Sequence, residues 1–293
     1  MNDYLRSEYG EKVYKLSFDL GATCPNRDGS LSTGGCAFCS EGGSGDFAVS
    51  ADDENFDEQI EEAKKKVAAK TDCRKFIAYF QSHTNTYLSG KITIDYLERV
   101  FLKAANNPEV VCISIGTRAD CIDTKIVDLL CKINKIKPVW VEIGLQTVSD
   151  KTRDEMNCAF TLLQFEKSYE LLRQNGIKTI VHMIVGLPNE TEEDWLNTAR
   201  YIGNIHPFGI KIQLLHVLKN TKLADIYNNG QFSVLTMEKY TDICVKILQM
   251  MPKDVVIHRM TGDGPKNLLI EPKWSTHKKK VLNTINKKLR ENE

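Results

Sequence analysis

Residues 24–39 read Cys24-Pro-Asn-Arg-Asp-Gly-Ser-Leu-Ser-Thr-Gly-Gly-Cys36-Ala-Phe-Cys39 and come directly after an apolar run that predicts a β-strand. Three cysteines are gathered here with no fourth cysteine or histidine beside them. A structural zinc site ordinarily takes four protein ligands, and a [4Fe–4S] cluster usually takes four thiolates. Three thiolates on such a cluster would leave one iron open for chemistry. The spacing alone leaves two alternatives, a three-ligand zinc site and unrelated core cysteines.

The composition is that of a globular protein from a reducing compartment. The 293 residues are 42% hydrophobic, enough for one large domain or two small ones. The sequence contains neither a run of eighteen apolar residues nor a signal-peptide pattern, so we expect a cytoplasmic protein that makes no membrane contact. Nine cysteines are an odd number at wide spacings, which argues against a secreted disulfide scaffold. The six cysteines outside the motif are interpreted as small core hydrophobes.

A net charge of zero hides an uneven distribution of charge. Residues 253–293 contain ten Lys and Arg against five Asp and Glu, a charge of about +5 that the rest of the chain balances. A basic segment of this kind can bind a polyanion. A solvated final helix explains the charge equally well.

Apolar runs that predict strands alternate with amphipathic stretches that predict helices. The strands are expected at Val13–Leu20, Phe76–Phe80, Val110–Ile115, Pro138–Leu145, Lys178–Val185, Ile210–Val217 and Val255–His258. The helices are expected at Asn55–Lys70, Ile94–Ala105, Lys125–Asn134, Leu162–Asn175, Glu192–Ile202 and Met237–Met250. This alternation favours βαβ units and a parallel sheet.

Polar residues follow the end of almost every predicted strand. In parallel α/β barrels the chemistry lies on the loops at the carboxyl ends of the strands. The cysteines follow the first strand, and later strand ends carry Gln81-Ser-His-Thr-Asn-Thr86, Thr117-Arg-Ala-Asp120, Gln146, Gly186-Leu-Pro-Asn-Glu190 and His216. The pattern therefore predicts a site at this end of the strands.

The cysteine spacing resembles a lengthened form of the radical S-adenosylmethionine (radical SAM) signature, which more commonly reads Cys-x3-Cys-x2-Cys. The chain from Tyr4 to Leu289 is similar to a bacterial family of Elongator-like radical SAM proteins, also described as Fe–S oxidoreductases. The segments that carry this resemblance are Cys24-Pro-Asn-Arg-Asp-Gly29, Gln81-Ser-His-Thr-Asn-Thr86, Gly116-Thr-Arg-x-Asp120, Glu142-x-Gly-Leu-Gln-Thr147, His182-x-Ile-Val-Gly-Leu-Pro188, Ile210-Lys-Ile-x-Leu-Leu-His216 and His258-Arg-x-Thr-Gly-Asp-Gly-Pro265.

The resemblance implies an α/β fold, a partial (β/α)6 TIM-like barrel with a short C-terminal extension. The barrel is expected over residues 1–250, including the N-terminal cluster loop, and a basic extension packed on it over residues 251–293. The implied cofactors are a [4Fe–4S] cluster, held by Cys24, Cys36 and Cys39, and S-adenosylmethionine. One electron from the cluster would cleave the sulfonium C–S bond, and the resulting 5′-deoxyadenosyl radical would abstract hydrogen from the substrate. An external donor such as flavodoxin or ferredoxin would supply the electron.

The predicted cofactor contacts lie on and beside the strand ends. Glu142, Gly144 and Gln146 share one face of their strand because side chains alternate. Their carboxylate and amide would need partners if they were buried, and the ribose hydroxyls of S-adenosylmethionine could be such partners. The complete set of predicted cofactor contacts is Phe38, Gln81, Glu142, Gln146, Arg153, Ile184 and Gly186.

The remaining polar residues near the strand ends are candidate substrate contacts, and together they indicate a polar, anionic ligand. They are His83, Asn85, Arg118, Asp120, His182, Gln213, His216, Lys219, His258 and Arg259. The Elongator-like resemblance and the basic C-terminal segment, which has Trp274 among its lysines, favour transfer RNA as the substrate. The C5 side chain of a wobble uridine is the expected target, with conversion of carboxymethylaminomethyl to aminomethyl as one reaction.

Two other functions remain open from the sequence. One is a radical SAM oxidoreductase that acts on a small anionic metabolite or a tetrapyrrole, and the other is a metal-binding protein without catalysis. One segment also departs from the family pattern. Relatives tend to have Asn-Arg-(Gly/Ala)-His where this chain has Asn157-Cys-Ala-Phe160, so the role of this loop is open.

Overall fold

The computed structural model describes residues 1–43, 48–262 and 264–291. The chain divides into two compact units. The first unit consists of Met1–Thr33, Gly42–Ile143 and Leu163–Thr179, and the second of Gly34–Glu41, Gly144–Leu162 and Ile180–Glu293.

The first unit is built on parallel strands that are adjacent in the order β2, β1, β3, β4, β5. Their bounds are β1 Val13–Asp19, β2 Val49–Ser50, β3 Lys75–Phe80, β4 Val110–Thr117 and β5 Val139–Gln146. The last three residues of β5 belong to the second unit. The parallel arrangement agrees with the βαβ pattern of the sequence.

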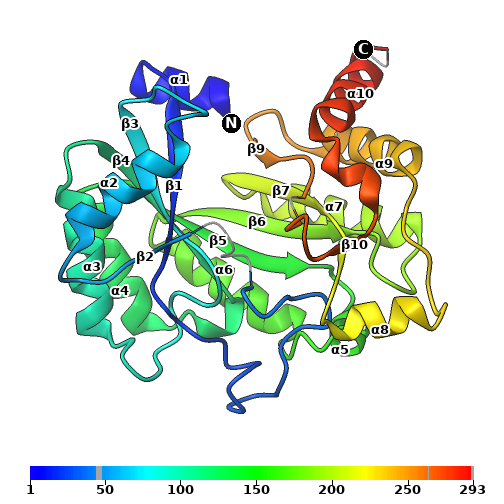
Figure 1. Cartoon of the computed structure of the whole chain (residues 1–293), viewed down its shortest axis with the longest axis horizontal. Coiled ribbons are helices and arrows are strands. Elements are labelled where there is room, and N and C mark those ends of the chain that lie inside the picture. The colour runs from blue at the N-terminus through cyan, green and yellow to red at the C-terminus, as the bar shows by residue number, and fades with distance from the viewer. Residues whose placement is uncertain (44–47, 263, 292–293) are drawn as a thin grey trace. The chain divides into compact units, whose positions relative to one another are not determined.

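Helices precede and follow the strands of the first unit. They are α1 Asn2–Tyr9, α2 Phe56–Val67, α3 Ile94–Asn106, η1 Ala119–Cys121, α4 Thr124–Asn134 and α6 Leu162–Gln174, of which Leu162 belongs to the second unit. Figure 1 shows α2, α3 and α4 on one side of the strands. Four buried phenylalanines pack between these helices and the sheet, with neighbouring ring centroids 5.0–5.9 Å apart, and they are Phe18, Phe56, Phe80 and Phe101.

The opposite face of this sheet is polar. On β1, Leu16 and Phe18 are fully buried, whereas Lys15 lies on the other face because side chains alternate along a strand. Lys15 Nζ lies 2.7 Å from Glu142 Oε1 on β5, although β3 and β4 lie between the two strands. Three strand spacings would separate β1 and β5 by about 14 Å in a flat sheet. The two side chains therefore extend toward each other across β3 and β4 on this face of the sheet.

The second unit has its own parallel strands, adjacent in the order β6, β7, β9. They are β6 Lys178–Val185, whose first two residues belong to the first unit, β7 Gly209–Leu214 and β9 Val256–Arg259. A separate antiparallel pair joins β8 Val217–Leu218 to β10 Leu269–Glu271. The helices are α5 Asp150–Glu155, α7 Glu192–Ile205, α8 Lys222–Asn228, α9 Met237–Met250, η2 Lys273–Thr276 and α10 Lys278–Glu291.

Most predicted elements are present with bounds that differ by three residues or fewer, and two of them, Lys178–Val185 and Met237–Met250, match fully. The strand predicted at Ile210–Val217 is wrong in one respect. It ends at Leu214, and the next two apolar residues after His216 pair with β10 instead. Among the described residues no helix is both long enough and apolar enough to cross a membrane.

Candidate functional site

The predicted site residues are distributed over both units. Those in the first unit are Cys24, Gln81, His83, Asn85, Arg118, Asp120 and Glu142. Those in the second unit are Cys36, Phe38, Cys39, Gln146, Arg153, His182, Ile184, Gly186, Gln213, His216, Lys219, His258 and Arg259. Each unit is therefore described by itself.

The loop of Cys24 is ordered by turns within its own sequence. Cys24 is buried, and its carbonyl oxygen accepts hydrogen bonds from the N–H groups of Arg27, at 2.8 Å, and Asp28, at 3.2 Å. The N–H of Leu31 donates to Pro25 O at 2.8 Å, and that of Ser30 donates to Asp28 Oδ1 at 3.0 Å. These contacts are typical of proline and aspartate turn chemistry, as the sequence predicts.

Cys36 and Cys39 lie on one tight turn in the second unit, in which Cys39 N–H donates to Cys36 O at 3.0 Å. The turn is attached to more distant segments of the same unit. Ala37 N–H donates to Met156 O at 2.8 Å, and Leu223 N–H donates to Ala37 O at 2.9 Å. Phe38 in this turn is half-buried.

All nine cysteines are present as thiols. Within the described residues, no three His, Cys, Asp or Glu side chains are arranged so that they could hold a metal ion. Ligation by Cys24, Cys36 and Cys39 therefore remains a prediction from the sequence motif.

Glu142 lies in a buried polar layer on the polar face of the sheet in the first unit. Its Oε1 accepts hydrogen bonds from Lys15 Nζ and Ser114 Oγ, both at 2.7 Å. Lys15 Nζ also lies 4.5 Å from the ring centroid of Tyr79, a cation–π contact. The carboxylate thus has a cationic partner and a hydroxyl donor from the protein itself. Lys15 is not among the predicted site residues, although its position on the polar face of an alternating strand is a usable signal.

Asn85 and Gln81 belong to the loop that follows β3. Asn85 is fully buried, and its Nδ2 donates to Gly116 O at 2.8 Å, while no described residue contacts its Oδ1 by a hydrogen bond. Gln81 is half-buried, and its N–H donates to Phe18 O at 3.0 Å.

Burial is the largest cause that lowers the pKa of His83, and the positive charge of Arg27 lowers it further, so the neutral imidazole is favoured. A Cβ at Gly43, which has a φ of 60°, would lie 2.4 Å from Ser82 O and 2.9 Å from His83 Nδ1. Glycine therefore allows the chain to pass close to this histidine.

Arg118 and Asp120 follow β4 and form a bidentate ion pair. Arg118 Nε lies 2.9 Å from Asp120 Oδ1, and Nη2 lies 2.8 Å from Oδ2. Both side chains are largely buried. The ion pair holds the Arg118 guanidinium in one orientation, which would suit contact with an anionic ligand.

Gln146 ends β5 in a left-handed conformation, with a φ of 67°. Its amide folds back over Gly144, where a Cβ would lie only 2.4 Å from Gln146 Nε2. Gln146 Oε1 is buried, and no described residue donates a hydrogen bond to it. The alternation of the strand predicted that these residues share a face, and the structure places their atoms in contact.

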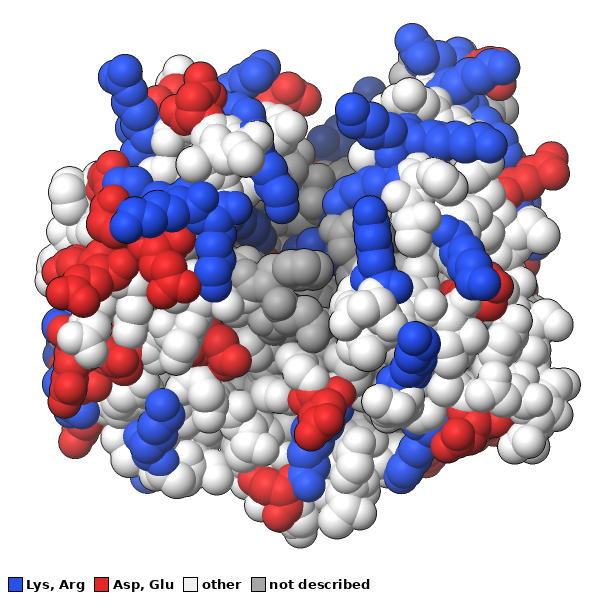
Figure 2. Space-filling model, in the orientation of Figure 1, with Lys and Arg blue, Asp and Glu red and all other residues white. Residues whose placement is uncertain are grey.

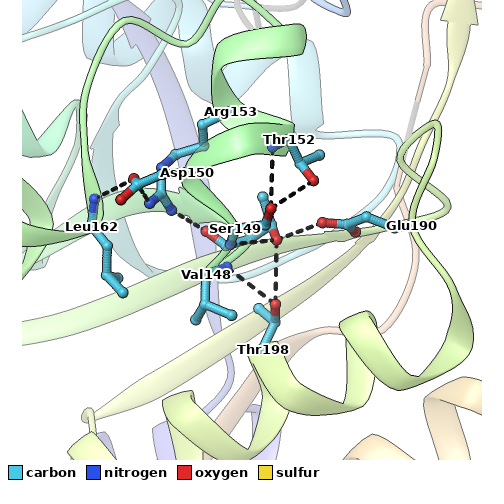
Figure 3. A network of polar contacts seen from close by, with 9 residues as sticks. Val148, Ser149, Asp150, Thr152, Arg153, Leu162, Glu190 and Thr198 are labelled. Carbon is cyan, nitrogen blue, oxygen red and sulfur yellow. Dashed lines mark hydrogen bonds and ion pairs between the residues drawn. The ribbon is translucent and has the colours of Figure 1, made fainter.

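Arg153, on α5, is fully buried within a polar network that Figure 3 shows. Its guanidinium donates to Thr147 O and Asp150, and it lies 5.6 Å from the ring centroid of Phe160. Asp150 Oδ1 also accepts a hydrogen bond from Leu162 N–H at 2.8 Å. The guanidinium therefore holds the loop after β5 together, and its predicted contact to a cofactor carboxylate remains a prediction.

Glu190 connects this network to the loop after β6. Thr147 Oγ1 donates to Glu190 Oε1 at 2.6 Å (Figure 3). Burial raises the pKa of Glu190, although hydrogen bonds from Thr147 and Thr152 act in the opposite direction.

One face of the sheet in the second unit carries His182 and Ile184 on β6 beside Lys211 and Gln213 on β7, and Gly186 follows the end of β6. Gln213 Nε2 lies 3.3 Å from His182 Nδ1. Lys211 is almost fully buried and is registered with His182. Lys211 is not among the predicted site residues, although it lies two residues before Gln213 and therefore on the same face.

Gly186 adopts a φ of 98° and approaches leucine side chains. A Cβ at this position would lie 3.3 Å from Leu235 Cδ1 and 3.7 Å from Leu215 Cβ. Glycine is thus required here by both conformation and space, as expected for a position where a ligand or backbone approaches closely.

The C-terminal part of the second unit encloses two histidines. His216 lies between β7 and β8, not at the end of a strand as predicted, and its Nε2 is 3.1 Å from Ser275 Oγ. His258 lies on β9 beside Gly209, where a Cβ would be 2.4 Å from its ring. Arg259 pairs with Lys211 in register and is half-buried, whereas Lys219 is exposed.

Comparison with known proteins gives a consistent assignment. Residues 24–202 match the Radical SAM superfamily, and residues 207–291 match the Radical_SAM C-terminal domain. The chain is 39% identical to the uncharacterized protein YtqA of Bacillus subtilis over 289 residues, 99% of this chain and 88% of YtqA. It is 27% identical to Elongator complex protein 3 of Schizosaccharomyces pombe over 65% of this chain and 35% of that protein.

Among solved structures, an archaeal Elp3 from Methanocaldococcus infernus with an N-terminal deletion has a TM-score of 0.69 at 19% identity. The match covers 94% of this chain and 63% of that chain. It confirms the predicted fold class, an α/β partial barrel of the radical SAM type. From the span of the superfamily match and the identity to YtqA, the chain belongs to the radical SAM superfamily.

Proposed function

We propose that the protein is a radical SAM enzyme that binds a [4Fe–4S] cluster through Cys24, Cys36 and Cys39. The observation that carries this proposal is the superfamily match, which begins at Cys24 and contains all three cysteines. When bound, the cluster supplies the one-electron chemistry that cleaves S-adenosylmethionine and removes a hydrogen atom from the substrate. An external reductant, such as flavodoxin or ferredoxin, would provide the electron.

The residues fit these cofactors by their chemistry. The three motif residues are thiols, and two of them lie on one tight turn, which suits a sulfur-ligated cluster. The buried Oε1 of Gln146 is an acceptor that a cofactor amino or hydroxyl group could satisfy. Gly186, beside Leu235, would give an adenine ring an apolar surface to lie on. Ribose hydroxyls would share Glu142 with Lys15 and Ser114.

Cleavage of the cofactor tests this proposal directly. Anaerobically reconstituted and chemically reduced protein should convert S-adenosylmethionine to methionine and 5′-deoxyadenosine. The variants Cys24→Ala, Cys36→Ala and Cys39→Ala should each lose this activity, because an incomplete ligand set cannot hold the cluster. Cys131→Ala is the matched control, since Cys131 lies on α4 and its Sγ contacts Asn175 Oδ1 at 3.8 Å. Unchanged cleavage in the motif variants would refute the proposal.

We infer that the substrate is transfer RNA, at the C5 side chain of a wobble uridine. The Elongator-like resemblance and the similarity to Elongator complex protein 3 support this inference. Abstraction of hydrogen from the carbon between the nitrogen and the carboxylate of a carboxymethylaminomethyl group would leave a stabilised carbon radical. Loss of one electron to the oxidised cluster and of one proton would convert this radical to an imine, and water would hydrolyse the imine to aminomethyl uridine and glyoxylate, which is the proposed reaction.

The C-terminal helix offers a surface for RNA phosphates. Lys and Arg side chains gather over the region where Figure 1 draws α10 (Figure 2). Lys278, Lys279 and Lys280 form its first turn and are exposed, and this turn contains no acidic residue. Three cations at a helix N-terminus act against the helix dipole, so they do not stabilise the helix. Their exposure allows them to contact a polyanion.

Two other basic residues are less suited to contact RNA. Lys288 Nζ lies 2.5 Å from Asp242 Oδ1, and Lys287 is paired with Glu291 at 3.6 Å. Trp274 is half-buried, its Nε1 donates to Leu235 O at 2.9 Å, and its ring centroid lies 5.8 Å from that of Tyr240. Contact of Trp274 with a base therefore remains a prediction from the sequence.

Salt-dependent binding of bulk tRNA distinguishes this substrate from a small metabolite. The triple variant with glutamine at positions 278, 279 and 280 should bind more weakly, and the slope of log affinity against log salt should fall by about two to three, one per lost phosphate contact. The matched control replaces Lys64, Lys65 and Lys66 on α2, where two of the three lysines are paired with glutamates. Equal slopes in the two triple variants would contradict a phosphate-binding role of α10.

Nucleoside analysis tests the target. Transfer RNA from a strain that lacks the gene should retain the unprocessed wobble nucleoside, and purified enzyme should convert it. An unchanged nucleoside profile together with salt-insensitive tRNA binding would favour the alternative, a small anionic metabolite or a tetrapyrrole. The zero net charge of the chain is the observation that favours this second candidate.

A further inference from the structure

The turn that carries Cys36 and Cys39 is held by a segment about 120 residues away in sequence. Met156 O accepts a hydrogen bond from Ala37 N–H at 2.8 Å, and Asn157 Nδ2 donates to Gly35 O at 2.8 Å. Gly35 O belongs to the peptide group that leads into Cys36, so Asn157 holds the orientation of that peptide group.

Asn157 differs from the other attachments of this turn because its contact depends on the side chain. The bonds of Ala37 to Met156 and Leu223 join backbone atoms and would form with almost any residues at these positions. Asn157 instead contributes an amide donor, and it does so from a left-handed conformation with a φ of 51°. Asparagine and glycine are the residues that adopt this conformation at low cost.

The loop that presents Asn157 is itself built on a rigid base. Cys158 N–H donates to Arg153 O at 2.8 Å, and Cys158 is buried. The fully buried guanidinium of Arg153 holds Thr147 and Asp150, with Phe160 beside it. The donor at Asn157 is therefore fixed by packed neighbours, which a positioning group requires.

We propose that Asn157 is a positioning residue for the iron–sulfur cluster, which it supports by holding the Gly35–Cys36 peptide so that the two thiols of the turn keep one arrangement. This inference rests on the proposed function, since it concerns the ligands of the proposed cluster. It assigns a role to the Asn157–Phe160 segment, which departs from the pattern of the relatives. Asn157 acts on the ligands through the backbone and does not ligate iron. Groups that orient metal ligands typically change metal affinity or activity about 10- to 100-fold when removed.

Two substitutions remove the donor and keep the backbone. Asn157→Gly retains access to positive φ, so the loop keeps its conformation without the amide. Asn157→Asp keeps the size of the side chain but places a carboxylate oxygen against Gly35 O, where a donor is needed. The matched control is Asn189→Gly, because Asn189 also has positive φ, at 63°, and donates through Nδ2, at 3.0 Å, but to Glu155 Oε2.

The first measurement is the rate at which the reconstituted, unreduced protein releases iron to a chelator, detected as the loss of visible absorbance. The second is the electron paramagnetic resonance spectrum of the reduced protein. Both Asn157 variants should release iron about tenfold faster than wild type and show altered g-values. Asn189→Gly should stay within about twofold of the wild-type rate.

The possible outcomes test the positioning role of Asn157 and the proposed function separately. Wild-type rates and spectra in both Asn157 variants would refute the positioning role and leave the proposed function intact. Equal acceleration in Asn189→Gly would also refute it, since the effect would then reflect general destabilisation of the unit. Wild-type protein that takes up no cluster would overturn the proposed function and this inference together.

Discussion

The two cysteine-bearing loops are held in different ways. In the loop of Cys24, the backbone hydrogen bonds among residues 24–33 join residues no more than seven positions apart. In the turn of Cys36 and Cys39, the attachments reach Met156, Asn157 and Leu223, between 119 and 186 residues along the chain. The first loop is shaped mainly by local hydrogen bonds, with one contact at 2.7 Å between the hydroxyls of Ser30 and Tyr87, and the second is attached to distant segments of its unit.

This difference has a thermodynamic consequence. Local turns form at a small entropic cost, whereas a contact between distant residues persists only while the chain between them is folded. We therefore expect the arrangement of Cys24 to depend on a few turn residues and that of Cys36 and Cys39 to depend on the stability of the network around Arg153.

Replacement of Arg153 by methionine should cause the largest difference in hydrogen exchange between the two cysteine loops. The variant leaves Thr147 O without its donor in a buried position, which should lower the free energy of unfolding by about 2 kcal/mol. The loss of the Asp150 ion pair adds little, because that carboxylate is 55% exposed. Hydrogen exchange should accelerate at Ala37, and exchange in the loop of Cys24 should not change.

Arg173→Met is the control for this experiment. Arg173 pairs with Glu170 on the exposed face of α6, so its loss should leave the free energy of unfolding nearly unchanged. If Arg153→Met left exchange at Ala37 unchanged, the dependence of the cysteine turn on this network would be disproved.

An intermediate effect is expected at Glu190, and it depends on pH. Because burial raises the pKa of Glu190, the unfolded chain loses this proton first as pH rises above about 4.3. The contribution of Glu190 to the free energy of unfolding is therefore present at low pH and is lost as pH rises through the raised pKa. Glu190→Gln keeps an acceptor for Thr147 and removes the ionisation, so the melting temperature of the variant relative to wild type should increase between pH 4 and pH 8.

Glu170→Gln serves as the comparison, and its melting temperature relative to wild type should change little between pH 4 and pH 8. Hydrogen bonding to Arg173 lowers the pKa of Glu170, so the contribution of this group to stability is present above about pH 4.3 and is lost only as pH falls through the lowered pKa. A pH-independent difference for Glu190→Gln would show that its carboxyl is not desolvated in solution.

The smallest effect is expected in the local loop. Asp28→Ala removes the acceptor for Ser30 N–H and should cost less than about 1 kcal/mol, as for other side chains that cap turns. Hydrogen exchange should accelerate at Ser30 only. Faster exchange at Ala37 as well would mean that the two loops are not independent.

The sequence predicted the features that depend on local pattern. Alternating apolar runs located the strands, and Pro25 and Asp28 indicated the turns of the first cysteine loop. Strand alternation also predicted that Gly144 and Gln146 share a face.

The features that the sequence did not predict depend on pairing between distant segments. The ion pair of Lys15 and Glu142 joins residues 127 positions apart on strands that are not neighbours. The position of His216 was missed because the strand ends early, at Leu214, and the following residues pair with β10. Neither the order of strands nor the course of the C-terminal segment follows from periodicity.

The contact between Gly144 and Gln146 has a consequence for reading related sequences. The amide of Gln146 occupies the space that any side chain at position 144 would need. In a homologue with alanine or a larger residue at that position, the glutamine must adopt another rotamer and withdraw its carbonyl from the strand end. Glycine at position 144 therefore identifies the homologues in which the glutamine at position 146 can present its carbonyl oxygen as an acceptor.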